Sequence, residues 1–159
     1  MRFHKEIVFP GRLDDVAELL ADEKFRRAVA ERAGAHDVDA TRTEEDGVVV
    51  ATVDSRQPAD GLPGVAKKFI GSELHIRQVE RWTSHDHADL DVTVPGTPLH
   101  VRGTVTLEQR GAETVQAVDA EIKVRVPLIG GQIETMIGRV LGHVLKLQAV
   151  VGAEHLAER

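Results

Sequence analysis

The sequence contains no cysteine and no tyrosine, and these absences narrow the kinds of site it can hold. Without cysteine there is no disulfide, thiolate metal ligand or cysteine nucleophile. Aromatic residues make up only 3% of the chain, so a pocket would be lined mainly by aliphatic side chains, which are poorly suited to stacking nucleobases. Uncharged runs stay well below the roughly 18 residues of a membrane span, and the N-terminal residues form no apolar signal region. We expect a cytoplasmic protein without stable membrane insertion.

The residues that are present indicate one soluble domain. The chain has 159 residues, of which 42% are hydrophobic and 29% charged, enough for one domain over residues 1–159 with a substantial core. The net charge is −6 and the lysines and arginines do not cluster, which argues against a nucleic-acid partner. The sequence also has no phosphate-binding loop or dinucleotide fingerprint, and we expect no cofactor.

Apolar periodicity predicts a series of strands with helices at two places. Residues 2–9 alternate as a strand does, and two short helices follow, with Asp22 as a cap of the second and Gly34 at its end. Between Ala35 and Val126 the period is two, and strands are predicted at about 35–43, 47–55, 73–82, 86–94, 99–109 and 113–126. Most links are short, so an antiparallel meander is expected.

The C-terminal part reads as one amphipathic helix over about residues 129–156, roughly 40 Å long. Its apolar arc contains Ile129, Ile133, Met136, Ile137, Val140, Leu141, Val144, Leu147 and Val151. Before it, Gly130-Gly131 are expected to allow a tight reversal after the last strand. A stripe of small residues lies opposite the arc, at Gly138, Gly142, Ala149 and Ala153. We expect this stripe to pack within the chain, against the two short N-terminal helices, with a homodimer contact as the alternative.

The order of one strand, two short helices, six strands and one long helix resembles the START-like superfamily, also called SRPBCC. That superfamily includes the birch-pollen-allergen type proteins, polyketide cyclases and lipid-transfer domains. A narrower similarity to a bacterial branch of unassigned function is carried by Leu62-Pro63, residues 67–71, Glu80-Arg-Trp82 and residues 126–131. The resemblance implies an α+β helix-grip fold, in which a curved seven-stranded antiparallel sheet wraps the last helix. It also implies a cavity for an apolar or amphipathic ligand between the two.

The strand pattern agrees in part with such a cavity. Alternate residues of the last two strands form apolar inward rows, Leu99, Val101, Val105 and Leu107, then Val118, Ala120, Ile122, Val124 and Val126. A sheet with one apolar concave face and one covering helix often leaves space unfilled.

Polar residues within the predicted inward rows are candidates for a site. The row that begins at Leu74 places Gln78, Glu80 and Trp82 on the inner face of one strand. A carboxylate there needs a partner, so Glu80 would be either a polar anchor for a ligand or a general acid. A register shifted by one residue, which is the favoured interpretation, would instead turn Val79 inward and Glu80 to solvent.

The last helix offers polar groups from the opposite wall. Gln148 lies inside its apolar arc and His143 at the edge, although a solvated histidine and a backbone-bonded glutamine are the simpler interpretation of each. Arg42 is a candidate partner for Glu80, but a surface arginine is favoured. The predicted ligand-binding residues are Gln78, Glu80, Trp82, Phe69, Met136, Val140, His143, Val144 and Gln148.

Phe69 belongs to a link, residues 57–71, that is too long for a hairpin and carries apolar residues of its own. Its apolar residues Val65, Phe69 and Ile70 would either form a lid over the cavity, with Lys67-Lys68 at the rim, or simply cap the core. A second segment, His85-Asp86-His87, invites a metal interpretation, but a solvated turn is favoured and we predict no metal site.

Three functions remain open. The leading hypothesis is the binding, transport or sequestration of a small apolar or amphipathic molecule, such as a lipid or polyketide-like metabolite. The first alternative is a cyclase, dehydratase or hydrolase that uses Glu80 as its acid or base. The second is a protein-interaction module or oligomeric regulator whose cavity is filled by its own side chains.

Overall fold

A computed structural model describes residues 1–59, 64, 67–68 and 71–159 of the chain. Its elements in chain order are β1 (Arg2–Phe9), α1 (Leu13–Ala21), α2 (Glu23–Arg32), β2 (His36–Glu45), β3 (Val48–Pro58), β4 (Glu73–Ser84), β5 (His87–Thr93), β6 (Leu99–Arg110), β7 (Glu113–Val124) and α4 (Gly130–Ala157). Most of the predicted lid, including Val65, Phe69 and Ile70, lies outside the described residues.

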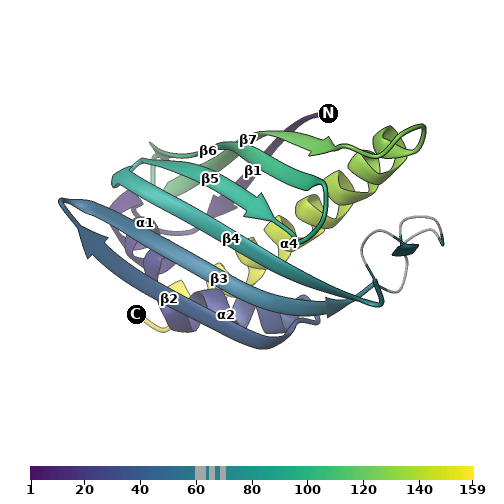
Figure 1. Ribbon diagram of the computed structural model, residues 1–159. Coiled ribbons are helices and arrows are strands. Elements are labelled where there is room, and N and C mark those ends of the chain that lie inside the picture. The colour runs from purple at the N-terminus through teal and green to yellow at the C-terminus, as the bar shows by residue number, and fades with distance from the viewer. Residues whose placement is uncertain (60–63, 65–66, 69–70) are drawn as a thin grey trace.

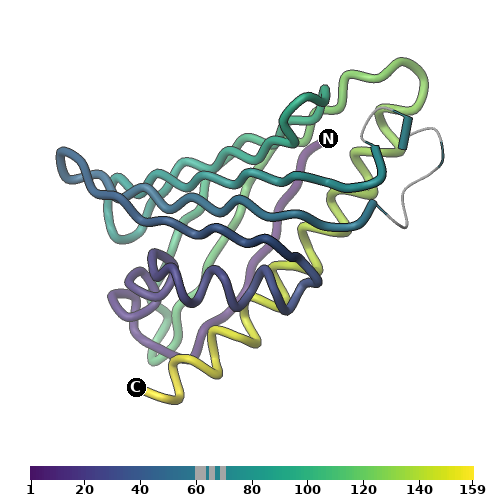
Figure 2. Tube along the Cα trace, turned by 60° about the horizontal axis from the view of Figure 1, so that its bottom comes forward, coloured from purple at the N-terminus to yellow at the C-terminus, as the bar shows by residue number. Residues whose placement is uncertain are grey.

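The strands form one seven-stranded sheet in the order β1-β7-β6-β5-β4-β3-β2, and every neighbouring pair is antiparallel. Strands β2 to β7 are the predicted meander, and β1 joins its free edge beside β7. The sheet is curved, and α1, α2 and α4 lie on its inner side (Figures 1 and 2). The helix-grip architecture is therefore confirmed, and the largest boundary error is three residues, at the end of β3.

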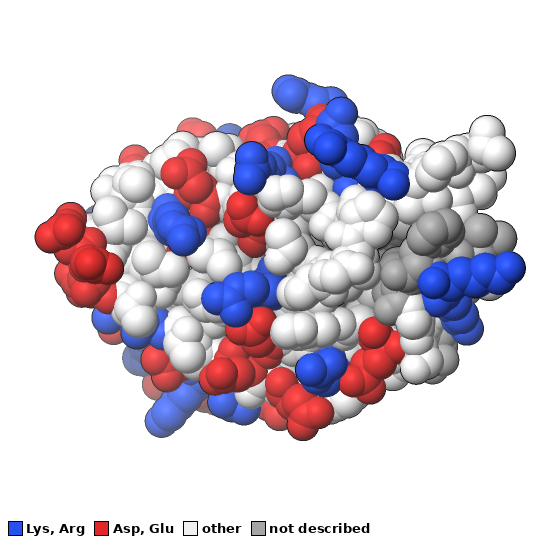
Figure 3. Space-filling model, in the orientation of Figure 1, with Lys and Arg blue, Asp and Glu red and all other residues white. Residues whose placement is uncertain are grey.

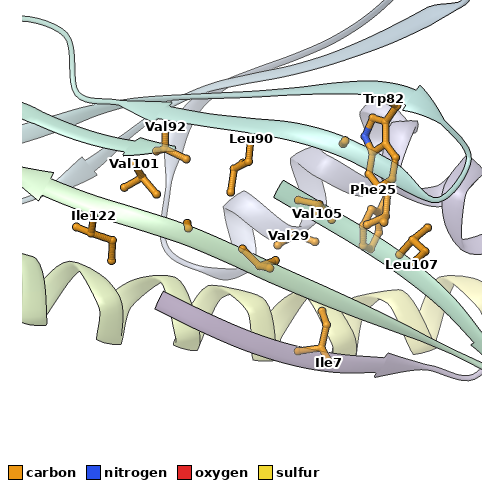
Figure 4. Packing of buried hydrophobic residues seen from close by; sticks show 14 of the residues in the cluster. Ile7, Phe25, Val29, Trp82, Leu90, Val92, Val101, Val105, Leu107 and Ile122 are labelled. Carbon is orange, nitrogen blue, oxygen red and sulfur yellow. The ribbon is translucent and has the colours of Figure 1, made fainter. Parts of the chain in front are cut away.

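The inward rows pack as predicted. Every residue of the two rows on β6 and β7 is buried, including Val126 just beyond β7. In Figure 4, Leu90, Val92 and Val101 occupy the layer between the strands and α4. The outer face of the sheet carries interspersed acidic and basic side chains (Figure 3). Because side chains alternate along each strand, one face of the sheet is buried and apolar and the other is exposed to solvent.

Strand β4 keeps its predicted inward row. Glu80 lies opposite Ala51 of β3 and Leu90 of β5, and the bulge in the pairing with β5 comes only between Trp82 and Ser84. Glu80 is 3% exposed and Trp82 6% exposed. The shifted register, with Val79 inward, is therefore wrong.

Helices α1 and α2 lie under the β2 side of the sheet (Figure 2). The Asp22 side chain accepts a hydrogen bond from the Lys24 N–H at 3.2 Å, as the predicted cap of α2. The buried face of α2 consists of Phe25, Arg26 and Val29. Because Arg26 has apolar neighbours on both sides of it in this face, its guanidinium is carried into the core.

Helix α4 is rotated about its axis from the position that its apolar arc predicts. Val140, a member of that arc, is 47% exposed, whereas Gly152, which is not, is buried with its Cα facing the Phe9 ring. Gly138 likewise faces Met1, Phe3 and Ile122. The small residues let the helix approach β1 closely. This close approach, and not the centre of the apolar arc, determines which side of α4 faces the sheet. Gly138 of the small-residue stripe therefore packs within the chain, as favoured, but against β1 and β7 and not against the two short helices. A Cβ on Gly142 would meet no described residue beyond its own turn of the helix within 4 Å.

The turn between β7 and α4 differs from the sequence prediction. Gly130 and Gly131 belong to the helix itself, and the residue in the left-handed region is Leu128, with φ of 70°. A Cβ on Gly130 would lie 2.6 Å from the Val124 carbonyl oxygen. Glycine is needed at this position for close approach to the strand and not for a reversal of the chain.

By length and composition alone α4 could cross a membrane. Here it lies along the sheet, and Ile133, Gln148 and Val151 are buried within the fold. The core helix of a water-soluble domain meets the same length and composition criterion, so this property does not identify a membrane segment.

A hydrogen bond to the Glu134 side chain connects the first turns of α4 to the end of β7. The Val124 N–H donates to Glu134 Oε2 at 3.0 Å, and this hydrogen bond holds the pKa of the Glu134 carboxyl below its ordinary value of 4.5, with a smaller contribution from the Met1 ammonium. The charged carboxylate thus stabilises the fold at neutral pH. The contribution is complete above the unfolded-state pKa and is lost as the pH falls through the lower folded-state pKa.

Glu134→Gln is expected to lower the free energy of unfolding by about 1 kcal/mol at neutral pH, because the amide accepts the same hydrogen bond without its charge. Urea denaturation of both proteins across the acid range measures the difference. It should shrink below the unfolded-state pKa of about 4.5. A difference that stayed constant into strong acid would contradict the assignment.

Candidate functional site

Two small adjoining cavities lie between the sheet and α4. The larger has a volume of about 90 Å³ and extends toward α2, and the smaller has a volume of about 40 Å³ and lies under β6 and β7. The residues that line both cavities are Gln78, Val92, Leu141, Val144 and Gln148. The space is thus divided by side chains of β4, β5 and α4, and its walls are mainly aliphatic.

An ion pair is buried at the junction of these cavities. Arg26 of α2 and Glu80 of β4 are 5% and 3% exposed, and Arg26 Nη2 donates directly to Glu80 Oε1. Arg26 Nε also donates to the Leu20 carbonyl oxygen at the end of α1, at 2.7 Å. That carbonyl is one of the helix-terminal acceptors without an intrahelical partner. The guanidinium therefore joins α1, α2 and β4 inside the core.

Three glutamines extend this ion pair into a hydrogen-bonded network. Gln78 Nε2 donates to Glu80 Oε2 at 2.9 Å. On the other side, Arg26 Nη1 donates to Gln148 Oε1 at 3.2 Å, and Gln148 Nε2 donates to Gln116 Oε1 at 2.8 Å. The network consists of Arg26, Glu80, Gln78, Gln148 and Gln116, and it links α2, β4, α4 and β7 across the cavities.

Two buried nitrogens in the described part of the chain have no hydrogen-bond acceptor, Gln116 Nε2 and Trp82 Nε1. Gln116 is fully buried and lines the smaller cavity. A buried donor without an acceptor costs about 1 to 3 kcal/mol, so such atoms in a native protein often mark a place for water or a ligand.

Both carboxylate oxygens of Glu80 are already engaged by donors of the chain, one by Arg26 and the other by Gln78. A general acid or base needs an oxygen that faces the substrate. The arrangement instead holds Glu80 as the counter-ion of a buried guanidinium.

The structure brings five of the nine predicted residues to the cavities: Gln78, Glu80, Val140, Val144 and Gln148. Val140 lies at the edge and is 47% exposed. Trp82 is buried but lines a separate surface cleft beside α1 and the β2–β3 hairpin, with a volume of about 430 Å³. Met136 and the exposed His143 line neither cavity, because α4 is rotated. Phe69 lies outside the described residues.

Sequence reasoning missed Arg26 and Gln116, although each left a signal. Arg26 follows Phe25 and precedes Val29 by three residues, a spacing that places it on the buried face of a helix. Gln116 is two residues before Val118 and continues the inward row of β7 toward its beginning. A polar residue at such a position is informative because it must find partners inside the protein.

The other polar candidates lie at the surface. Arg42 is exposed and its Nη2 lies 3.6 Å from Glu44 Oε2, so Glu80 is paired with Arg26 and not with Arg42. His85 contacts Asp14 at 3.1 Å and His87 lies 3.6 Å from Asp89. Within the described residues, no three His, Asp or Glu side chains are grouped as a metal site.

Comparison with protein families gives a match over almost the whole chain. The model of a family described as "Protein of unknown function (DUF2505)" matches residues 5–156. The chain belongs to this family. An uncharacterised protein of Mycobacterium tuberculosis (strain ATCC 25618 / H37Rv) is 24% identical over 112 residues. That alignment covers 65% of the chain and 63% of the relative, so the chain matches less than two thirds of the relative's length.

Solved structures share the fold of this family member at low identity. A START superfamily protein from Mycobacterium smegmatis has a TM-score of 0.65 at 12% identity, with 98% of each chain covered. An aromatase/cyclase from Streptomyces sp. R1128 has a TM-score of 0.62 at 12% identity, covering all of this chain and 94% of the other. The START-like fold expected from the sequence is thereby confirmed.

Proposed function

We propose that the protein binds a small, mainly apolar molecule between the sheet and α4. The observation that carries this proposal is the pair of aliphatic cavities with one polar network at their junction. Binding pockets for small molecules commonly have this composition, with a few placed polar groups on apolar walls. The START-like fold supports the same interpretation, since it sets a curved sheet around one long helix.

The cavity volumes favour a compact ligand. The two cavities approach a volume of about 150 Å³, at which an engineered apolar cavity in another protein takes up benzene, only when a ligand displaces the side chains that divide them. A molecule with one ring or a short branched chain fits this scale. A long acyl chain would require a displacement of α4 from the sheet.

An enzymatic function is the alternative, because the same fold occurs in a protein named as an aromatase/cyclase. The geometry of Glu80 favours binding over such chemistry. Its two oxygens are taken by Arg26 and Gln78, and the paired charges already neutralise one another.

Filling the shared space tests the proposal. Val144 lines both cavities, so a phenylalanine side chain at this position would occupy the space between them. We expect Val144→Phe to reduce the affinity for a ring-sized apolar probe such as toluene at least tenfold. Calorimetry or nuclear magnetic resonance titration measures the affinity, and circular dichroism verifies the fold.

Val150→Phe is the matched control, because Val150 is on the same helix and 50% exposed. Its affinity for toluene should equal that of the wild type. Native mass spectrometry of the purified protein provides a second measurement, with a retained small molecule as the expected result. If the wild type neither retained a molecule nor bound a panel of ring-sized probes, the proposed function would be wrong.

A further inference from the structure

The hydrogen bonds of the network determine which way each amide faces. The Arg26 guanidinium has only donors, so Gln148 must turn its Oε1 toward Arg26 Nη1. Gln148 Nε2 then faces Gln116 and requires its Oε1 as an acceptor, at 2.8 Å. The amide group of Gln116 is thereby turned so that its Nε2 is the last donor of the chain of hydrogen bonds.

The branch of the network through Glu80 and Gln78 ends in an acceptor instead of a donor. Glu80 has only acceptors when it is ionised, so Gln78 turns its Nε2 toward Glu80 Oε2. Gln78 Oε1 is then the acceptor that this amide offers. Gln78 and Gln116 both line the smaller cavity, so the donor at one end of the network and the acceptor at the other belong to residues around the same space.

The charges of the network compensate one another. The Arg26 guanidinium is in direct contact with the Glu80 carboxylate, and both groups are nearly fully buried. A carboxylate or ammonium on a ligand would bring an additional charge into this space without a counter-ion. Burying a charge in this way is far more costly than burying a neutral polar group.

From these observations we infer that the ligand is uncharged and carries an oxygen that accepts a hydrogen bond from Gln116 Nε2. An alcohol or phenol hydroxyl suits the site best, because it accepts from Gln116 and can donate to Gln78 Oε1. The inference rests on the proposed function and adds the chemical class of the ligand. It also explains why Gln116, fully buried, is left with a donor that no described residue accepts.

Phenol and toluene are a suitable pair of probes, because they differ in one hydroxyl for one methyl group. Their affinities differ partly through their transfer from water, so the informative quantity is the ratio of the two dissociation constants in wild type and variant. We expect Gln116→Met to shift this ratio against phenol about three- to tenfold, the contribution of one neutral hydrogen bond. Gln132→Met, at an exposed position of α4, is the control and should leave the ratio unchanged.

Measurements on the wild type keep the test independent of how well the variant folds. The side-chain amide resonances of Gln116 should shift on addition of phenol and much less on addition of toluene. Benzoate should bind at least tenfold more weakly than phenol. Both neutral probes could bind while Gln116→Met leaves the ratio of dissociation constants unchanged and phenol leaves the Gln116 amide resonances unshifted. The cavity would then be a binding site in which water accepts the Gln116 hydrogen bond, and this inference would be overturned. If neither probe binds, the proposed function itself fails.

Discussion

Glu80→Gln is expected to lower the free energy of unfolding by about 3 to 5 kcal/mol, the usual cost of breaking a buried ion pair from one side. The substitution preserves side-chain volume but leaves the Arg26 guanidinium without a counter-ion, at 5% exposure. Glu80 accepts hydrogen bonds from Arg26 and from Gln78, one at each oxygen. In the variant, one of these two donors would face the amide nitrogen of the new glutamine. Urea denaturation at neutral pH measures the change.

An exposed ion pair of the same kind is the control. Arg32 Nη2 and Glu154 Oε2 lie 3.0 Å apart, and both side chains are about half exposed. Glu154→Gln should change stability by less than about 1 kcal/mol, because water solvates either partner. Equal effects at Glu80 and Glu154 would contradict the burial of the network.

A double substitution separates the effect of the buried charges on stability from the effect of the side-chain volume. Arg26→Met with Glu80→Leu removes both charges and keeps apolar volume, and such replacements are often close to neutral in stability. The double variant should therefore be more stable than the sum of its two single variants predicts. It should also lose the preference for a neutral hydroxyl, because no ion pair would orient Gln148 and Gln116.

The sequence made Glu80 a candidate for the inner face because alternate residues of a strand share a face. The pattern did not fix the register, and the favoured interpretation turned Val79 inward; the regular pairing of β4 with β5 as far as Trp82 places Glu80 inward instead. Its partner could not be predicted in the same way. Arg26 is 54 residues away in the chain and is brought to Glu80 only by the packing of α2 under the sheet.

The position of α4 was predicted less well than its length. A helical wheel centres the buried face on the largest group of apolar side chains, which includes Val140 and Met136. The close approach at Gly138 and Gly152 instead draws the helix toward β1. Met136 and His143 were placed at the cavity for this reason, whereas Gln148 remained inside the buried face under either rotation.

Gly152→Ala is expected to lower the free energy of unfolding by about 2 kcal/mol, although alanine is the better helix former. An added Cβ would lie 2.7 Å from Phe9 Cδ1 and closer still to Cε1, and the Phe9 ring is fully buried. The Leu19 side chain, which is also buried, lies 3.6 Å from the same Cβ position, so the added methyl group has a second neighbour in the core. Thermal and urea denaturation measure the loss.

Gly142→Ala is the matched control on the same helix, since its added Cβ would meet no described residue beyond its own turn of the helix within 4 Å. It should raise stability by about 0.8 to 1 kcal/mol, the helix propensity difference between the two residues. The opposite signs at Gly142 and Gly152 separate close packing from propensity, and stabilisation at both would contradict the observed rotation of α4. Because α4 forms one wall of both cavities, Gly152→Ala should also weaken the binding of toluene, whereas Gly142→Ala should not.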